Sequence, residues 1–206
     1  MDIKEYGLLF WVAVAVFSLL VASPFLSRVL VYPRTEFFTE LWILDANSRT
    51  EDYPFNITSS QNYSIYLGIG NRLGYCAYYL VQVKFRNETQ SAPTSFGPIE
   101  SRVPSNLTSL FNITAFVADG QVWEIPINFS FNYYYNGTLS RVEFSGLTLN
   151  GVWLNMIDYT ISWDAEIREF RGFLFFELWL FNVSANIFQY HGRFVSLRLN
   201  MTVETV

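Results

Sequence analysis

Short runs of alternating apolar and polar residues occupy most of the chain after residue 36. Successive side chains of a strand point to opposite faces, so a strand with one buried face alternates with period two. Gln121–Phe131 and Phe194–Val203 show this alternation clearly. Six more runs are aromatic or β-branched and end at turn residues: Phe37–Leu44, Tyr63–Gly70, Tyr75–Arg86, Leu110–Val117, Val142–Leu149 and Phe173–Phe181. The spacing predicts a mainly β chain folded as an antiparallel sandwich.

Two segments between these runs carry turn residues, and a third is undefined. Gly70–Gly74 is typical of a hairpin connection, and Asp119–Gly120 of a tight turn. Gly151–Arg171 shows no clear period, and it is compatible with a short helix or an extra hairpin.

The N-terminal segment Tyr6–Ser27 contains no charged residue. About 22 residues at about 1.5 Å each would cross a hydrocarbon core of roughly 30 Å. A cleaved signal peptide is the alternative, but cutting after Ser23 would place Pro24 directly beyond the scissile bond. We therefore expect an N-terminal transmembrane helix as an anchor over residues 1–31, and one extracytoplasmic sandwich domain over residues 32–206.

Asparagines in Asn-x-Ser/Thr sequons, the acceptors of N-linked glycans, are in strong excess. Random placement of the 15 Asn and 31 Ser or Thr residues would give about 2.3 such sites. The chain has nine, at Asn56, Asn62, Asn87, Asn106, Asn112, Asn128, Asn136, Asn182 and Asn200. All follow the apolar segment, and transfer occurs on the translocated side of the membrane. The sequence thus predicts a single-pass cell-membrane glycoprotein with its N-terminus inside and its C-terminal domain extracellular.

Two of these asparagines fall where strand geometry turns them away from the core. Asn128 lies on the polar face of Gln121–Phe131, and Asn200 lies on the polar face of Phe194–Val203. A glycan cannot be packed into a core, so the alternation and the sequons agree.

Reactive side chains are few. His191 is the only histidine, in a segment typical of a hairpin turn, and Cys76 is the only cysteine, expected to be a small buried side chain in a strand. Asp164, Glu166 and Glu169 could bind a hard cation, but the interleaved arginines favour a charge-paired surface. We expect no catalytic residue, cofactor or metal site.

Residues 32–86 resemble a known family. The matching segments are Tyr32–Leu44, Tyr53–Thr58, Leu67–Asn71 and Tyr78–Val83. They are similar to the archaeal membrane-protein family called domain of unknown function 1616, although Arg72 and Leu73 stand where that family usually has His-Glu. The resemblance implies an archaeal, surface-facing immunoglobulin-like sandwich with no established activity, and it supplies no catalytic residue.

These features favour a non-catalytic role at the cell surface, structural or in binding a protein partner there or in the membrane. The chain carries a net charge of −5 and shows no basic stripe, so nucleic acid is not an expected partner. Three alternatives stay open: a filament or surface-layer subunit of pilin type, an accessory subunit of a larger membrane complex, and a hydrolase that uses carboxylates.

Overall fold

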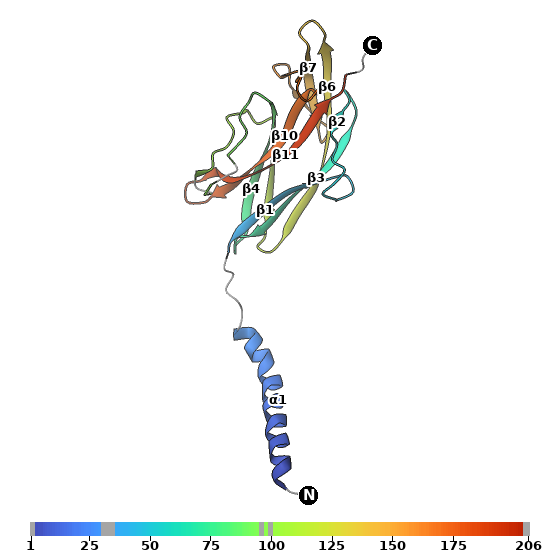
Figure 1. The fold of residues 1–206 in the computed structure, drawn as a ribbon. Coiled ribbons are helices and arrows are strands. Elements are labelled where there is room, and N and C mark those ends of the chain that lie inside the picture. The colour runs from blue at the N-terminus through green and yellow to red at the C-terminus, as the bar shows by residue number, and fades with distance from the viewer. Residues whose placement is uncertain (1–2, 30–35, 95–96, 99–100, 204–206) are drawn as a thin grey trace. The chain divides into compact units, whose positions relative to one another are not determined.

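A computed structural model of the chain describes residues 3–29, 36–94, 97, 98 and 101–203 (Figure 1). The chain divides into two compact units, residues 1–37 and 38–206. The domain boundary predicted between residues 31 and 32 lies outside the described residues.

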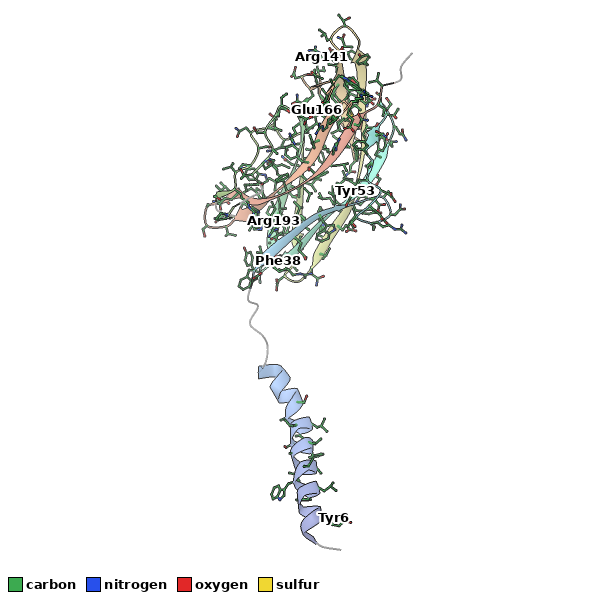
Figure 2. The ribbon with its side chains drawn as sticks, in the orientation of Figure 1. Tyr6, Phe38, Tyr53, Arg141, Glu166 and Arg193 are labelled. Carbon is green, nitrogen blue, oxygen red and sulfur yellow. The ribbon has the colours of Figure 1, made fainter. Side chains whose placement is uncertain are left out.

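The first unit contains helix α1, Ile3–Val29, of 27 residues. Its side chains are described at Tyr6, Gly7 and residues 9–23, and Figure 2 shows them pointing outward around the helix axis. Trp11 and Phe17 are 70% and 69% exposed. Over the described residues, no helix is long and apolar enough to cross a membrane.

One sheet of the second unit has six described strands. They are β1 (Phe38–Leu44), β3 (Tyr63–Arg72), β6 (Val122–Asn136), β7 (Arg141–Leu149), β8 (Val152–Asn155) and β9 (Thr160–Ser162). The order is β1-β3-β6-β7-β8, with β9 also paired to β7. Every pair in this sheet is antiparallel.

The other sheet has five described strands. They are β2 (Asn56–Ile57), β4 (Ala77–Asn87), β5 (Phe111–Val117), β10 (Arg171–Asn182) and β11 (Ile187–Met201). The order is β2-β11-β10-β4-β5, so β5 forms an outer edge. Figure 1 shows the long strands β10 and β11 side by side. The short β2 pairs with β11 in parallel, and the other pairs are antiparallel.

The core lies between the two sheets. Phe85 of β4 contacts Phe131 of β6 and Phe144 of β7, with ring centroids 5.4 and 5.2 Å apart. Further side chains that are fully or almost fully buried come from both layers: Ile65, Leu67, Ile127, Phe129, Val83, Leu174, Phe176 and Leu199. The predicted mainly β architecture with two packed sheets is therefore confirmed, and each strand run found in the sequence overlaps an observed strand.

A glycine inside β3 is explained by the side chain that covers it. Gly68 pairs with Trp42 of β1 and with Glu124 of β6. A Cβ atom at Gly68 would lie 2.2 Å from the Trp42 ring, so no larger residue fits beneath the indole. Trp42 Nε1 donates to Glu124 Oε2 at 3.2 Å, and the ring therefore spans three strands on the outer face of the sheet.

The Gly70–Gly74 segment is not a hairpin. Its first three residues end β3 in one sheet, and the chain then leads to β4 in the other, so the prediction of a hairpin connection is wrong. Cys76 lies in this crossover and is exposed, which corrects its expected burial in a strand. The predicted tight turn at Asp119–Gly120 is present, because Gln121 N donates to Ala118 O at 3.1 Å and Gly120 has φ 77°.

The undefined region 151–171 contains β8 and β9 rather than a helix. Asn150 and Gly151, with φ 48° and 81°, form the two-residue turn between β7 and β8. Asn-Gly is the dipeptide most typical of such a turn, because both positions require positive φ.

Candidate functional site

Five of the predicted acceptor asparagines lie exposed on the second unit. They occupy the start of β2, the residue before β3, the loop between β4 and β5, and the strands β5 and β6: Asn56, Asn62, Asn106, Asn112 and Asn128. Asn128 faces away from its buried strand neighbours Ile127 and Phe129, as the alternation predicts. These five asparagines present their side chains to solvent, as attachment of a glycan requires.

The other four acceptors are half-buried, and each donates a hydrogen bond from its amide nitrogen Nδ2. Asn87 donates to Thr160 O at 3.2 Å, and Asn136 donates to Glu143 Oε1 at 2.9 Å. Asn182 donates to Gln189 Oε1 at 3.0 Å, and Asn200 donates to Asn56 Oδ1 at 2.9 Å. A sugar attached at Nδ2 replaces one of its two hydrogens, so at these four sites the sugar has to fit beside a hydrogen bond of the folded chain.

His191 lies inside β11, at an irregularity in the pairing with β10, and not in the turn expected from the sequence. Its Nε2 lies 2.9 Å from Thr39 Oγ1, which is itself 2.9 Å from the Tyr79 hydroxyl. Tyr79 donates to Asn71 Oδ1 at 3.3 Å. The four side chains form a polar chain that links both sheets within the sandwich.

Asn71, the last of the four residues, determines which atom donates in each hydrogen bond of this polar chain. Asn71 Nδ2 donates to two backbone carbonyls, so its Oδ1 must be the acceptor. Tyr79 then accepts from Thr39, and Thr39 accepts from the Nε2–H of His191. Thr39 is 1% exposed, so its hydroxyl cannot reach a substrate. Burial, with a smaller contribution from the Arg193 charge, lowers the pKa of His191 to about 4.

The predicted acidic cluster is held by charge pairs and backbone groups. Asp164 Oδ2 accepts from Arg171 at 3.0 Å, and its Oδ1 accepts from the Glu166 amide at 2.9 Å. Glu169 pairs with Arg198 at 2.6 Å. Across the described residues no three His, Cys, Asp or Glu side chains are grouped in a way that could hold a metal ion.

A cleft of about 690 Å³ opens beside the edge strand β8, and we call it the edge cleft. Its walls come from residues 106–110, 153–155 and 158–160, together with Phe85, Asn87 and Gln90. Residues with amide, hydroxyl and carboxylate side chains line the cleft together with an exposed tryptophan, Trp153. Most of the wall belongs to segments for which the sequence alternation predicted no strand. The Asn150–Gly151 dipeptide, which is typical of a hairpin turn, was the sequence signal that could have located the edge strand β8.

No family model matches the chain, and no curated protein matches it. Solved structures of a β-glucosidase from Listeria innocua are similar only in part. The isofagomine complex has a TM-score of 0.39 and 10% identity over 82% of this chain, and the glucose complex has 0.37 and 10% over 84%. The chain spans 17% of the length of these enzymes. With TM-scores below 0.5 and 10% identity, these similarities assign no function to the chain.

Proposed function

We propose that the protein is a membrane-anchored, N-glycosylated extracytoplasmic β-sandwich with a non-catalytic structural or partner-binding role at the cell surface. The observation that carries the proposal is the set of five exposed acceptors, Asn56, Asn62, Asn106, Asn112 and Asn128. They are spread over both sheets and a connecting loop. All follow the uncharged segment Tyr6–Ser27, which supports an outside location for the sandwich and an inside location for the N-terminus.

The non-catalytic assignment is supported by the surroundings of the most reactive side chains. His191 is engaged by a buried threonine, and Asp164 and Glu169 are engaged by arginines. The two mainly antiparallel sheets also support an immunoglobulin-like form of the sandwich. The proposal keeps the resemblance of residues 32–86 to domain of unknown function 1616, which rests on the sequence segments alone.

Peptide mapping of protein isolated from its native membrane is expected to find sugar on the five exposed asparagines. Occupancy should be lower at Asn87, Asn136, Asn182 and Asn200, because each uses its amide in a hydrogen bond of the folded chain. The measurement is mass spectrometry of each sequon peptide with and without glycan. Unmodified asparagine at all nine sites would overturn the proposed function, and a preference for the four half-buried sites would overturn the structural ranking.

The anchor is tested separately. The full chain is expected to stay in the membrane pellet through an alkaline carbonate wash, whereas a chain lacking residues 1–31 should be recovered in the supernatant after the same wash. A matched variant with Leu19→Arg and Leu20→Arg should also lose retention, because two charges near the middle of the segment oppose insertion. Release of the unchanged full chain by carbonate, or a native N-terminus near Pro24, would contradict an uncleaved anchor.

A further inference from the structure

We infer that the edge cleft holds the glycan attached to Asn106, with the sugar stacked on the indole of Trp153. This inference rests on the proposed glycosylation and names the place of one glycan in the fold. Two acceptors line the cleft, Asn87 and Asn106. Asn87 is half-buried and bonded to Thr160 O, whereas Asn106 is exposed, so Asn106 is the attachment point that lets a sugar enter.

Trp153 is a rigid and open surface. It is 55% exposed, and its ring lies over Gly146 of the neighbouring strand β7. A Cβ atom at Gly146 would lie 2.2 Å from the ring, so the absence of a side chain there lets the indole lie flat against the sheet. A large aromatic face held in one position buries apolar area at little entropic cost, and the C–H face of a sugar ring is a flat partner for it.

The polar part of the cleft suits hydroxyl groups. Asn155 accepts from the Ile157 amide through Oδ1 at 3.0 Å, which fixes its amide and leaves Nδ2 as a donor. Asp158 contributes a carboxylate acceptor, and Thr160 contributes a hydroxyl. A sugar hydroxyl both donates and accepts, so it can satisfy all three kinds of group. The volume of about 690 Å³ lies within the range of small-molecule sites.

The test is a double-variant cycle on the full chain, purified from membranes of a glycosylating host. We expect Asn106→Gln and Trp153→Ala each to lower Tm by about 2–4 °C, and the combined variant to lower it no further than the larger single effect. In unglycosylated full chain, purified from membranes of a host that lacks N-glycosylation, Trp153→Ala should leave Tm within about 1 °C, because the side chain is half-exposed. Asn112→Gln, which removes an acceptor on β5 outside this cleft, is the matched control and should add independently to Trp153→Ala.

A second measurement does not depend on stability. Sugar protons of the Asn106 glycan should show an upfield ring-current shift in NMR spectra, and Trp153→Ala should abolish that shift. Additive Tm changes together with unshifted sugar protons would overturn the inference while leaving the glycosylation intact. A bare Asn106 beside glycans at other sites would also overturn it. Absence of glycan from every site would instead overturn the proposed function.

Discussion

Replacing Glu177 with glutamine is expected to lower the free energy of unfolding by about 3 to 5 kcal/mol. Glu177 Oε2 lies 2.7 Å from Lys84 Nζ, and the two side chains are 0% and 3% exposed. Glutamine keeps an oxygen for the Ser105 amide but leaves the Lys84 ammonium buried without a counter-charge. Removal of one partner from a buried pair is costly for this reason.

The pair also fixes a long loop. Ser105 lies in the connection between β4 and β5, and its backbone and hydroxyl groups contact both charges. Figure 1 shows this connection, in green, next to β10 and β11. We therefore expect Glu177→Gln to increase hydrogen exchange at the Ser105 amide, because the carboxylate that accepts from it is replaced by a weaker neutral acceptor.

Thermal unfolding of the full chain, followed by near-ultraviolet circular dichroism, measures the main effect. Each kcal/mol shifts Tm by about 2–4 °C in a unit of this size, so the expected loss is about 6–20 °C. Glu51→Gln is the matched control, since its pair with Arg49 is 3.7 Å long and both side chains are about two-thirds exposed, at 67% and 65%. That change should cost less than about 1 kcal/mol. A Glu177→Gln protein with the same Tm as the wild type would show that the buried pair contributes nothing to the stability of the fold.

Stability is expected to fall by about 3 kcal/mol between pH 7 and pH 4 because of His191 alone. Its pKa is about 4 in the folded chain against an ordinary value of 6.5. The unfolded chain therefore binds the proton first as the pH falls, and protons favour unfolding throughout this window. Above about pH 6.5 His191 is neutral in both states and the folded chain keeps its full stability. That stability falls as the pH approaches 4, because only the unfolded chain binds the proton readily.

His191→Gln separates this effect from the titration of carboxylates. Glutamine can still donate from its amide to Thr39 but does not titrate, so the fall in Tm between pH 6.5 and 4.5 should largely disappear. Hydrogen bonds from the Ile167 amide and the Tyr134 hydroxyl hold the pKa values of Asp164 and Glu143 below their usual range, so their effects come at lower pH. Equal pH dependence of the variant and the wild type over this window would exclude His191 as its source.

The alternation of apolar and polar residues was sufficient to locate most strands of the sandwich, because successive side chains of a strand point to opposite faces whatever the rest of the fold. The sheet to which a strand belongs is set by contacts distant in sequence. Gly70–Gly74 has the residues of a hairpin turn, yet the chain crosses there between the two sheets, and Cys76 is consequently exposed at a surface bend. Turn chemistry alone does not distinguish these two outcomes.

The buried charges show the same limit. Lys84 and Glu177 stand on the faces of their strands opposite to the core residues Phe85, Phe176 and Leu178, where a charged side chain is expected to meet solvent. They are buried because the β4–β5 connection covers this face and Ser105 bonds to both. Likewise, the sequons identify nine candidate acceptors, but the ranking of Asn87 below Asn106 requires the hydrogen bond to Thr160, which is 73 residues away.

The outer edge at β5 has a consequence for how copies of this protein behave at high concentration. Its seven residues, Phe111–Val117, are mostly apolar, and Phe116 is 72% exposed. A free edge of this kind is a template on which a strand from another molecule can add, and repeated addition leads to aggregation. Asn112 stands on this strand with its side chain in solvent. A bulky, hydrated sugar there would keep neighbouring molecules from joining edge to edge, so chains made without glycans are the ones that should precipitate on concentration.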